Sequence, residues 1–387
     1  MGVTLDGGSN SYQVSKEDLA KRLNAVDLFC GAGGFSLAAI NSGFDVVFAV
    51  ENDRHAVATY VEYFNNKRGR RTKLYTESIN DLRPTELVEK HFTQAECDIV
   101  LGGPPCQGFS THRINDAGID DPRNRLIHSY FAFVEALRAR VFLMENVPGI
   151  LWPRHKDFLD EFSSNATGAG YRLFPPAVLD ARDFGVPQRR KRVFVLGVRN
   201  DVSTADLIWP PQPTHSNSDE TLSPWVNCSD VFSPAPENDP NDIHMSHGHQ
   251  LVNAFKNTPP NGGSRKDSGR TLPCHENHDG HKDVYGRIDP AQPGPTMTTA
   301  CINPSKGRFV HPTEHHGITP RQAARMQTFP DDFVFSGGLT AAGRQIGNAV
   351  PVDLGTALLT TIAEWLLRGD AQSKKHIRES SLCRYSD

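Results

Sequence analysis

Long hydrophobic runs are missing from this sequence of 387 residues. No stretch approaches the ~18 consecutive apolar residues that a membrane-spanning helix needs. The start of the chain also lacks the basic residues and apolar segment of a secretory signal peptide. We therefore expect a soluble cytoplasmic protein that makes no contact with a membrane.

Closely spaced cysteine pairs are absent too, which excludes a disulfide framework and predicts free thiols in a reducing compartment. The seven scattered cysteines are Cys30, Cys97, Cys106, Cys228, Cys274, Cys301 and Cys383. Six histidines lie between His244 and His281, but their spacing fits no closed four-ligand zinc site. A polar surface lobe is therefore preferred to a zinc site there, and no metal is predicted.

A strong charge of one sign is also lacking. Forty-one basic and 45 acidic residues give a formal net charge of −4, and the pI is about 6.5. Any surface for nucleic acid would therefore be a local patch. The length suggests two domains, or one large domain with a lobe, and the 37% hydrophobic share is enough for a sizeable core.

Short apolar runs alternate with helix-like stretches over the first half of the chain. This alternation predicts an α/β fold with a Rossmann-like, mostly parallel sheet and helices on both faces. The expected strands are Ala25–Cys30, Asp45–Val50, Asp98–Gly102, Val141–Val147 and Val193–Val198. The expected helices are Gly34–Ser42, Asp53–Phe64, Thr85–His91, Arg123–Arg140 and Lys156–Ser163. Such sheets bind ligands at the carboxyl ends of their strands, where every motif described below lies.

The second half of the chain has a different texture. Residues 201–285 are rich in Pro, Asn, Asp, Ser and His and predict a smaller, loop-rich lobe. Thr319, Pro320 and Gln322 form the pattern of a capped helix start, and this helix is expected to run to about Thr328.

Apolar residues at helical spacing predict a last amphipathic helix over Gly355–Leu367. The tail beyond Arg368 is polar and is expected to fray.

A glycine-rich turn follows the first expected strand and reads Asp27-Leu28-Phe29-Cys30-Gly31-Ala32-Gly33-Gly34-Phe35-Ser36. Glycines let a ligand approach the backbone, and the following helix offers free N–H groups. Ser36 stands where the dinucleotide fingerprint has a third glycine, which argues against a pyrophosphate cradle. Glu51 ends the second strand, where an acid would hold ribose hydroxyls. A tight turn without a ligand remains the alternative for this segment alone.

A single cysteine stands in the sequence Gly102-Gly103-Pro104-Pro105-Cys106-Gln107-Gly108, directly after an expected strand. Two prolines stiffen the approach and glycines flank the loop, so the pattern presents one thiol on a rigid turn. Buried structural cysteine is the usual interpretation of a lone thiol. The proline and glycine setting favours a nucleophile instead.

Two further motifs carry charged groups. Glu145 ends the strand Val141–Val147 behind three apolar residues, so its pKa is expected to be raised and it is a candidate acid. The alternative is a capping or salt-bridged Glu. Gln188, Arg190 and Arg192 share one face of an extended chain and are suited to a phosphate or a base carbonyl. A solvated basic edge is the alternative there.

Together and in this order, these motifs closely resemble the cytosine-5 DNA methyltransferase family, over Ala25 to about Leu367. The stretches Pro293–Thr299 and Arg321–Pro330 and the closing Gln345-Ile346-Gly347-Asn348-Ala349-Val350 also look like family sequence. Each motif alone is weak, whereas the ordered set is very specific.

The resemblance implies a methyl transfer from S-adenosylmethionine to carbon 5 of a cytosine that swings out of double-stranded DNA. The implied catalytic residues are Cys106 as nucleophile, Glu145 at the pyrimidine N3 and N4, Arg190 bracing the pyrimidine, and Arg192 in support. The implied cofactor-binding residues are Leu28, Phe29, Gly31, Ala32, Gly33, Gly34, Phe35, Glu51, Asn52, Ser78, Ile79, Pro104, Asn348 and Ala349.

The same resemblance implies the domain organisation: an arm (1–20), a catalytic and cofactor-binding domain (21–200), a target-recognition lobe (201–335), a return to the catalytic domain (336–368) and a polar tail (369–387). Arg123, Arg125 and the run Lys67–Arg71 are candidate phosphate contacts, with a solvated loop as the alternative for the run. The expected protein is a monomer that works with a cognate restriction endonuclease on the same site.

Two positions depart from the family pattern. Where members often have Gly-Asp-Ile for the adenine amino group, this sequence has Glu77-Ser78-Ile79, with Asp81 two residues further. Ser78, Asp81 or the backbone would take over that contact. Asn52 follows Glu51 where members often have an aromatic residue that stacks on the adenine.

Three other functions compete with this interpretation. A nicotinamide oxidoreductase also needs a Rossmann-like start, but the Pro-Cys loop argues against it. An RNA cytosine-5 methyltransferase uses the same chemistry, but that branch of the family carries a Cys-Phe-Thr signature and lacks a large lobe. A catalytically dead DNA-binding regulator is disfavoured by the intact Cys106 and Glu145.

Overall fold

The computed structural model describes residues 22–93, 96–105, 125–268 and 283–382, and of residues 125 and 373–382 it describes the backbone alone. Cys106, Arg123 and the expected N-terminal arm lie outside this described part of the chain.

Eight strands form one sheet in the order β3-β2-β1-β4-β5-β8-β6, and β7 follows β6 along the same edge of β8. The first five strands pair in parallel, whereas β8 is antiparallel to β5, β6 and β7. The expected mostly parallel sheet is therefore confirmed. The strands are β1 Leu23–Leu28, β2 Phe44–Val50, β3 Lys73–Tyr75, β4 Ile99–Gly102, β5 Val141–Asn146, β6 Tyr171–Leu173, β7 Ala177–Asp180 and β8 Lys191–Arg199.

The described α-helices are α1 Gly34–Asn41, α2 Arg54–Tyr60, α3 Pro84–His91, α4 Arg125–Leu137, α5 Lys156–Gly168, α6 His249–Asn257, α8 Pro320–Met326, α9 Leu339–Asn348 and α10 Val352–Leu382. A π-helix over Val61–Lys67 continues α2.

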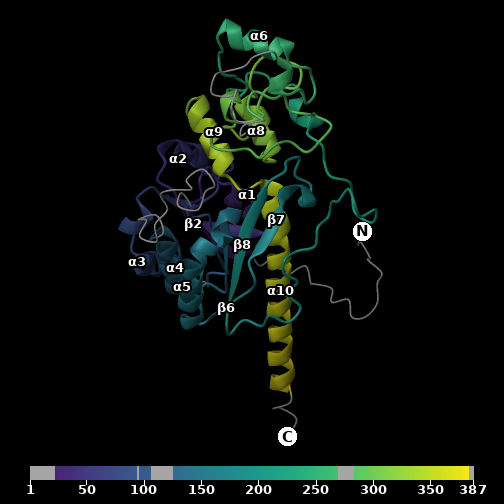
Figure 1. Cartoon of the computed structure of the whole chain (residues 1–387). Helices are drawn as coiled ribbons and strands as arrows, with labels where there is room; N and C mark the ends of the chain where they lie inside the picture. The colour runs from purple at the N-terminus through teal and green to yellow at the C-terminus, as the bar shows by residue number, and fades with distance from the viewer. Residues whose placement is uncertain (1–21, 94–95, 106–124, 269–282, 383–387) are drawn as a thin grey trace.

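Helices cover both faces of the sheet because its central strands are apolar on both sides. In β4, Ile99 and Leu101 belong to the core shared with α1 and α10, whereas Val100 belongs to the core shared with α3, α4 and α5. Figure 1 shows α3, α4 and α5 on one side and α10 on the other. The predicted two-sided cover is therefore confirmed.

The smaller lobe lies above this sheet in Figure 1 and carries α6 and α8 between long loops. The predicted start of α8 is confirmed, because Thr319 and Gln322 form a reciprocal capping box. α9 contacts both α8 of the lobe and α2 of the sheet domain. The chain is thus back beside the sheet when α10 begins.

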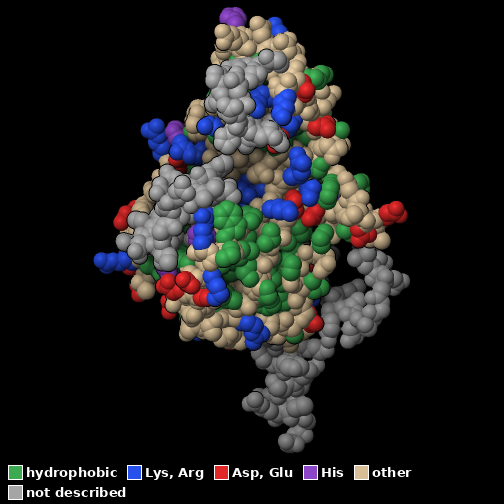
Figure 2. Space-filling view, viewed as in Figure 1, with side chains coloured by type: hydrophobic (Ala, Val, Ile, Leu, Met, Phe, Trp, Pro, Cys, Tyr) green, Lys and Arg blue, Asp and Glu red, His purple; other side chains and the backbone are tan. Residues whose placement is uncertain are grey.

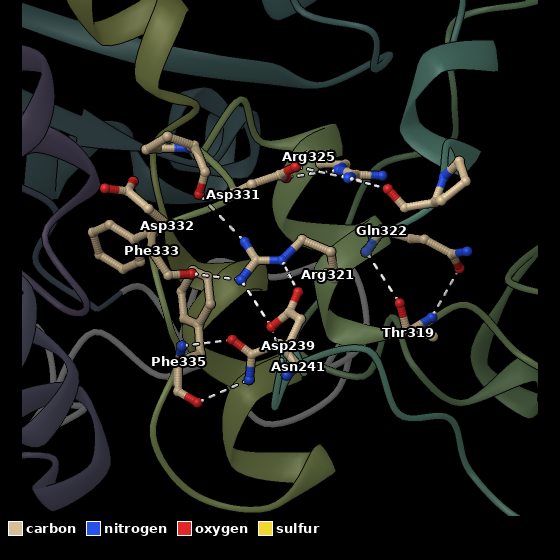
Figure 3. A network of polar contacts seen from close by, with 12 residues as sticks. Asp239, Asn241, Thr319, Arg321, Gln322, Arg325, Asp331, Asp332, Phe333 and Phe335 are labelled. Atoms are coloured by element: carbon tan, nitrogen blue, oxygen red, sulfur yellow. Dashed lines mark hydrogen bonds and ion pairs between the residues drawn. The ribbon is translucent and has the colours of Figure 1, made fainter. Parts of the chain in front are cut away.

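A buried arginine holds the loops of the lobe together (Figure 3). The Arg321 guanidinium is fully buried, pairs with the Asp239 carboxylate, and donates to the Phe333 carbonyl at 3.0 Å. Close by, the Asn241 side chain accepts from the Phe335 N–H at 2.7 Å and donates to its carbonyl at 3.0 Å. These bonds replace regular secondary structure in a loop-rich region.

The prediction for the C-terminal helix is wrong at its end. The helix does not stop near Leu367 with a frayed tail but continues to Leu382. One physical reason is Arg140, whose Nη2 donates to Asp370 Oδ1 at 2.7 Å and fastens the helix beyond its apolar part.

The stretch Leu339–Gln372 is long and apolar enough to cross a membrane, but 61% of its apolar window is buried inside the protein. Its apolar face covers the sheet, as in the core helix of a soluble protein.

Candidate active site

The motifs found in the sequence meet at one edge of the sheet. Leu28 at the end of β1 pairs with Val50 of β2 on one side and with Gly102 of β4 on the other. Gly102 in turn pairs with Met144 of β5. The glycine-rich turn, Glu51, the Pro-Cys loop and Glu145 therefore leave the sheet side by side, as expected for carboxyl ends of parallel strands.

Glu145 is a buried carboxyl group held by one arginine. Its Oε1 lies 2.8 Å from Nε of Arg192, the second residue of β8. Burial raises the pKa of Glu145, and the charges of Arg192 and Arg190 oppose that shift. A carboxyl in this setting is able to hold a proton or share it with a bound base.

The stem of the cysteine loop lies against this carboxyl. A side-chain carbon at Gly103 would come within 3.1 Å of Glu145 Oε2, which places this part of the loop in close contact with the carboxyl. The neighbouring Asn146 side chain donates to the Pro104 carbonyl at 3.5 Å. Cys106 itself lies outside the described residues, two positions past Pro104.

The basic strand has two faces, as its alternation predicts. Gln188 and Arg190 are buried and Arg192 is half-buried, whereas Arg189 and Lys191 are exposed. The Gln188 side chain accepts from the Met297 N–H at 2.7 Å and donates to the Met326 carbonyl at 2.9 Å.

Arg190 is bonded to main-chain carbonyls. Its Nη1 donates to the Met297 carbonyl at 2.7 Å, and its Nη2 donates to the carbonyls of Gly347 and Ala349 at 2.8 and 2.9 Å. These bonds hold the start of β8 against the stretch Pro293–Thr299 and the motif Gln345–Val350. Arg192, which the sequence predicts as a supporting residue, is the arginine in contact with Glu145.

The glycine-rich turn has an unusual backbone. Gly31 and Gly33 have φ angles of 55° and 102°, and Phe29 has a φ of 59°. A non-glycine residue in the left-handed region stores strain, which is often found at binding sites. Gly33 lies on Phe64 of the π-helix, where an added Cβ would come within 2.3 Å of the ring.

Glu51 holds this turn from the second strand. Its Oε2 accepts from the Gly31 N–H at 2.9 Å, and its Oε1 accepts from the N–H groups of Asn52 and Asp53 at 2.9 and 2.7 Å. Burial raises the pKa of Glu51, and these backbone bonds oppose the shift. A carboxylate has about four acceptor positions, so one remains for a ligand hydroxyl.

The last motif returns to the turn, as the family resemblance implies. A Cβ on Gly34 would meet the Val350 carbonyl at 2.6 Å and the Ala349 Cβ at 3.4 Å. Gln345 accepts from the Thr59 hydroxyl at 2.6 Å and so links α9 to α2. Asn348 is exposed.

The remaining predicted cofactor residues divide by burial. The side chains of Leu28, Ala32, Phe35 and Ile79 lie in the core, so they shape the site from beneath. Pro104 is also buried, while Asn52 is exposed.

Ser78, one of the residues predicted to take over the adenine contact, lies at a helix start. The Ser78 hydroxyl accepts from the Asn80 N–H and caps a short 3₁₀ helix, and Asp81 is exposed.

Three basic residues of the run Lys67–Arg71 lie beside acidic side chains. Arg68 Nη2 lies 2.8 Å and Lys67 Nζ 3.3 Å from Asp332 Oδ2, and Arg70 lies 3.6 Å from Asp45. The first two pairs join the π-helix to the lobe. These partly exposed pairs compete with the candidate phosphate contacts, which stay a prediction.

Sequence reasoning passed over a buried group beneath the turn. Asp27 is fully buried, and the Ser36 hydroxyl donates to its Oδ2 at 2.7 Å. The available signal was an acidic residue inside an otherwise apolar strand, because such a residue is rarely buried without a role.

Comparisons with known proteins agree with this geometry. The sequence profile described as C-5 cytosine-specific DNA methylase matches residues 23–364. The chain is 32% identical to the type II methyltransferase M1.HphI of Haemophilus parahaemolyticus, covering 88% of this chain and 86% of that protein. It is 30% identical to M.DdeI of Desulfomicrobium norvegicum, covering 88% of each. A prophage-encoded E. coli structure superposes with a TM-score of 0.66 at 25% identity, covering 89% of this chain and 99% of that one.

Proposed function

The chain belongs to the C-5 cytosine-specific DNA methylase family and is a DNA (cytosine-5-)-methyltransferase; from this premise we propose how its residues perform the reaction. Cys106 is the nucleophile, Glu145 the proton-holding group and Arg192 its charged partner. The observation that carries this proposal is the buried Glu145 carboxyl lying against the Gly103–Pro104 stem of the cysteine loop.

The Cys106 thiolate adds to C6 of the cytosine, and the electrons of the C5–C6 double bond move to C5 and toward N3. Glu145 holds a proton at N3 while this charge develops and accepts from the N4 amino group. C5, made electron-rich by this addition, would take the methyl group that S-adenosylmethionine supplies. A base then takes the C5 proton, the thiolate leaves and the C5–C6 double bond returns. Splitting one difficult step into two easier ones is the advantage of a covalent nucleophile.

Arg192, rather than Arg190, is the guanidinium that we assign to the pyrimidine side of the site. It is half-buried beside Glu145, whereas the Nη atoms of Arg190 are bonded to main-chain carbonyls. Arg190 is a positioning residue that holds β8 against residues 297 and 347–349.

The family implies S-adenosylmethionine as methyl donor, and it supplies an electrophilic methyl group on a positively charged sulfur. The residues of the turn fit such a ligand. Gly31 has open space above its Cα, and Glu51 keeps one acceptor position. We assign the main chain from Phe29 to Gly34 and Glu51 to this ligand, with Asn52, Ser78, Pro104, Asn348 and Ala349 at its edges.

The cytosine has to leave the duplex to reach this site, at a cost of a few kcal/mol of stacking and pairing. The lobe from residue 201 to 335 reads the flanking sequence in the major groove. We further propose a cytoplasmic monomer in a restriction–modification system with a cognate endonuclease. The type II methyltransferase names of its relatives support that context.

The decisive experiment incubates the protein with duplex DNA and labelled S-adenosylmethionine and maps the modified bases. Wild type labels C5 of cytosine at defined sites, Cys106→Ala does not, and Cys383→Ala, a cysteine outside the motifs, serves as the matched control. DNA with 5-fluorocytosine at the target traps wild type covalently. Equal labelling by Cys106→Ala and wild type would remove Cys106 from the scheme.

A further inference from the structure

Histidines from two distant segments of the chain meet in the smaller lobe. His244 and His247 belong to the loop before α6, whereas His311 and His316 belong to a hairpin over residues 309–318, in which the His311 N–H donates to the His316 carbonyl at 2.9 Å. The rings of His244 and His316 are stacked, with centroids 3.9 Å apart and 4° between their planes, and the His311 ring lies 5.4 Å from that of His316. We call these four residues the histidine cluster.

The surroundings of His311 and His247 suit neutral rings. Nδ1 of the buried His311 accepts from the N–H groups of Thr313 and Glu314 at 3.3 and 3.0 Å, so this nitrogen carries no proton. Nε2 of His247 is buried and has no hydrogen-bond partner in the described part of the chain. An imidazolium carries an N–H on both ring nitrogens. A second proton therefore breaks both bonds at His311 and leaves His247 with a charge but no acceptor at Nε2.

Electrostatics also keep the cluster uncharged at neutral pH. Burial lowers the pKa of His247, His311 and His316, and that of His311 falls to about 4. Neighbouring histidines lower these pKa values further, because like charges close together repel. The other charged or titratable groups around the rings are Asp242, Arg287, Glu314 and His315. The two acids oppose the shift at His311 and His316, but burial is the larger cause.

A buried arginine connects the hairpin to α6. Arg287 is 1% exposed, and its Nη1 donates to the His311 carbonyl at 2.7 Å. On its other side, Nη2 donates to the Phe255 carbonyl of α6 at 2.6 Å and Nε donates to the Thr258 carbonyl at 3.0 Å. The position of α6 therefore depends on the hairpin. Figure 1 shows α6 at the end of the lobe far from the sheet, so a movement here leaves the sheet in place.

We propose that the histidine cluster makes the smaller lobe open in acid while the sheet stays folded. The neutral rings hold the hairpin against the loop before α6. Proton uptake charges the stacked rings, breaks the bonds at His311 and releases the hairpin together with α6. The consequence for the enzyme rests on the proposed function: acid disturbs the lobe assigned to the flanking DNA sequence before it disturbs the cofactor turn. The opening itself needs neither DNA nor cofactor and is tested without them.

Hydrogen exchange of the whole protein, followed by mass spectrometry at pH 7.5 and pH 5.5, tests this opening. The protection factor is compared, which is the ratio of the intrinsic to the observed exchange rate, because this ratio removes the ordinary effect of pH on exchange. The pKa of His311 is about 4 in the closed lobe, against the usual 6.5 in an open one, so the open form binds more protons as the pH falls. Linkage then gives about a tenfold loss of protection in residues 309–318 and α6. Strands β4 and β5 keep their protection.

His311→Asn keeps an acceptor near the position of Nδ1 but takes up no proton, so its loss of protection should be smaller than that of wild type by about threefold or more. His249→Asn, a change at an exposed histidine of α6 outside the cluster, is the matched control and loses as much protection as wild type. Equal protection of the wild-type hairpin at both pH values overturns the proposal, and this arm needs no variant to fold. The full loss in folded His311→Asn overturns it too, as does an equal loss in β4 and β5.

Discussion

Glu145→Gln removes the charge that faces Arg192 while preserving the shape of the side chain. Breaking a buried ion pair from one side costs about 3–5 kcal/mol when the remaining charge has no other partner. Here the two side chains are 14% and 11% exposed, and Arg192 also donates to the Lys191 carbonyl. We therefore expect a smaller loss, about 2 kcal/mol of unfolding free energy. Methyl transfer should fall by about 10²–10⁴, the usual contribution of a general acid.

A double-mutant cycle separates the pair from its surroundings. Urea unfolding and single-turnover methyl transfer are measured for wild type, Glu145→Gln, Arg192→Gln and the double variant. If the two side chains act as one unit, the stability losses are non-additive by about 1.5 kcal/mol, within the range for residues in contact. The double variant then loses little more activity than Glu145→Gln alone.

Additive stability losses, with a coupling energy below about 0.5 kcal/mol, would mean that the contact seen here is energetically irrelevant. Full methyl transfer by Glu145→Gln would refute the role of Glu145 as the group that holds the proton at N3. Lys156→Gln, a change at an exposed helical ion pair with Asp160, serves as a control expected to alter stability by less than about 0.5 kcal/mol.

Arg190→Met should lower the unfolding free energy by about 3 kcal/mol in urea titrations, because the buried Met297 and Gly347 carbonyls lose this donor and the Ala349 carbonyl keeps only Gln327. An effect below about 1 kcal/mol would contradict its clamp role. Gly33→Ala should weaken S-adenosylmethionine binding at least tenfold when the affinity is measured by calorimetry. The φ angle of Gly33 is 102°, and the Phe64 ring blocks the new Cβ. An unchanged affinity would argue against the turn as the ligand site. Burial lowers the pKa of His311 from 6.5 to about 4, so the folded form binds fewer protons than the unfolded form. Thermal unfolding should therefore show stability falling between pH 6.5 and pH 4, with a shallower fall in His311→Gln. Arg68→Ala should leave the salt dependence of DNA binding unchanged, because its partner is Asp332 and not phosphate; a slope reduced by about one would refute this.

Much of the sheet could be predicted from the sequence, because strand and helix periodicities differ and the expected strands are strongly apolar. The runs around Leu101 and Leu143 had to be buried on both sides, which only a covered parallel sheet achieves. The antiparallel direction of β8 was not predictable, since an apolar run reads the same in either direction. The end of α10 was missed because tertiary contacts, among them the ion pair from Arg140 to Asp370, hold a polar segment that propensity alone leaves open.

The candidate site shows the same division. Glu51, Glu145 and the glycine-rich turn were identifiable because each ends an apolar run, and strand ends converge in this class of sheet. The separate roles of Arg190 and Arg192 could not be identified from the sequence, because both lie on one face of the extended segment that leads into β8. The partners of Arg190, at residues 297 and 347–349, are more than a hundred positions away, whereas Arg192 contacts Glu145 of the neighbouring strand.

Sequence by itself determined the class of fold, the order of the motifs and the kinds of chemical group available, because these depend on local periodicity and residue type. Tertiary structure alone decided which charges are paired and which are left single. Arg192 faces Glu145, Arg68 faces Asp332, and Asp27 faces no cation in the described part of the chain. The physical reason is that burial and charge pairing depend on distances between residues far apart in the chain, and folding sets those distances.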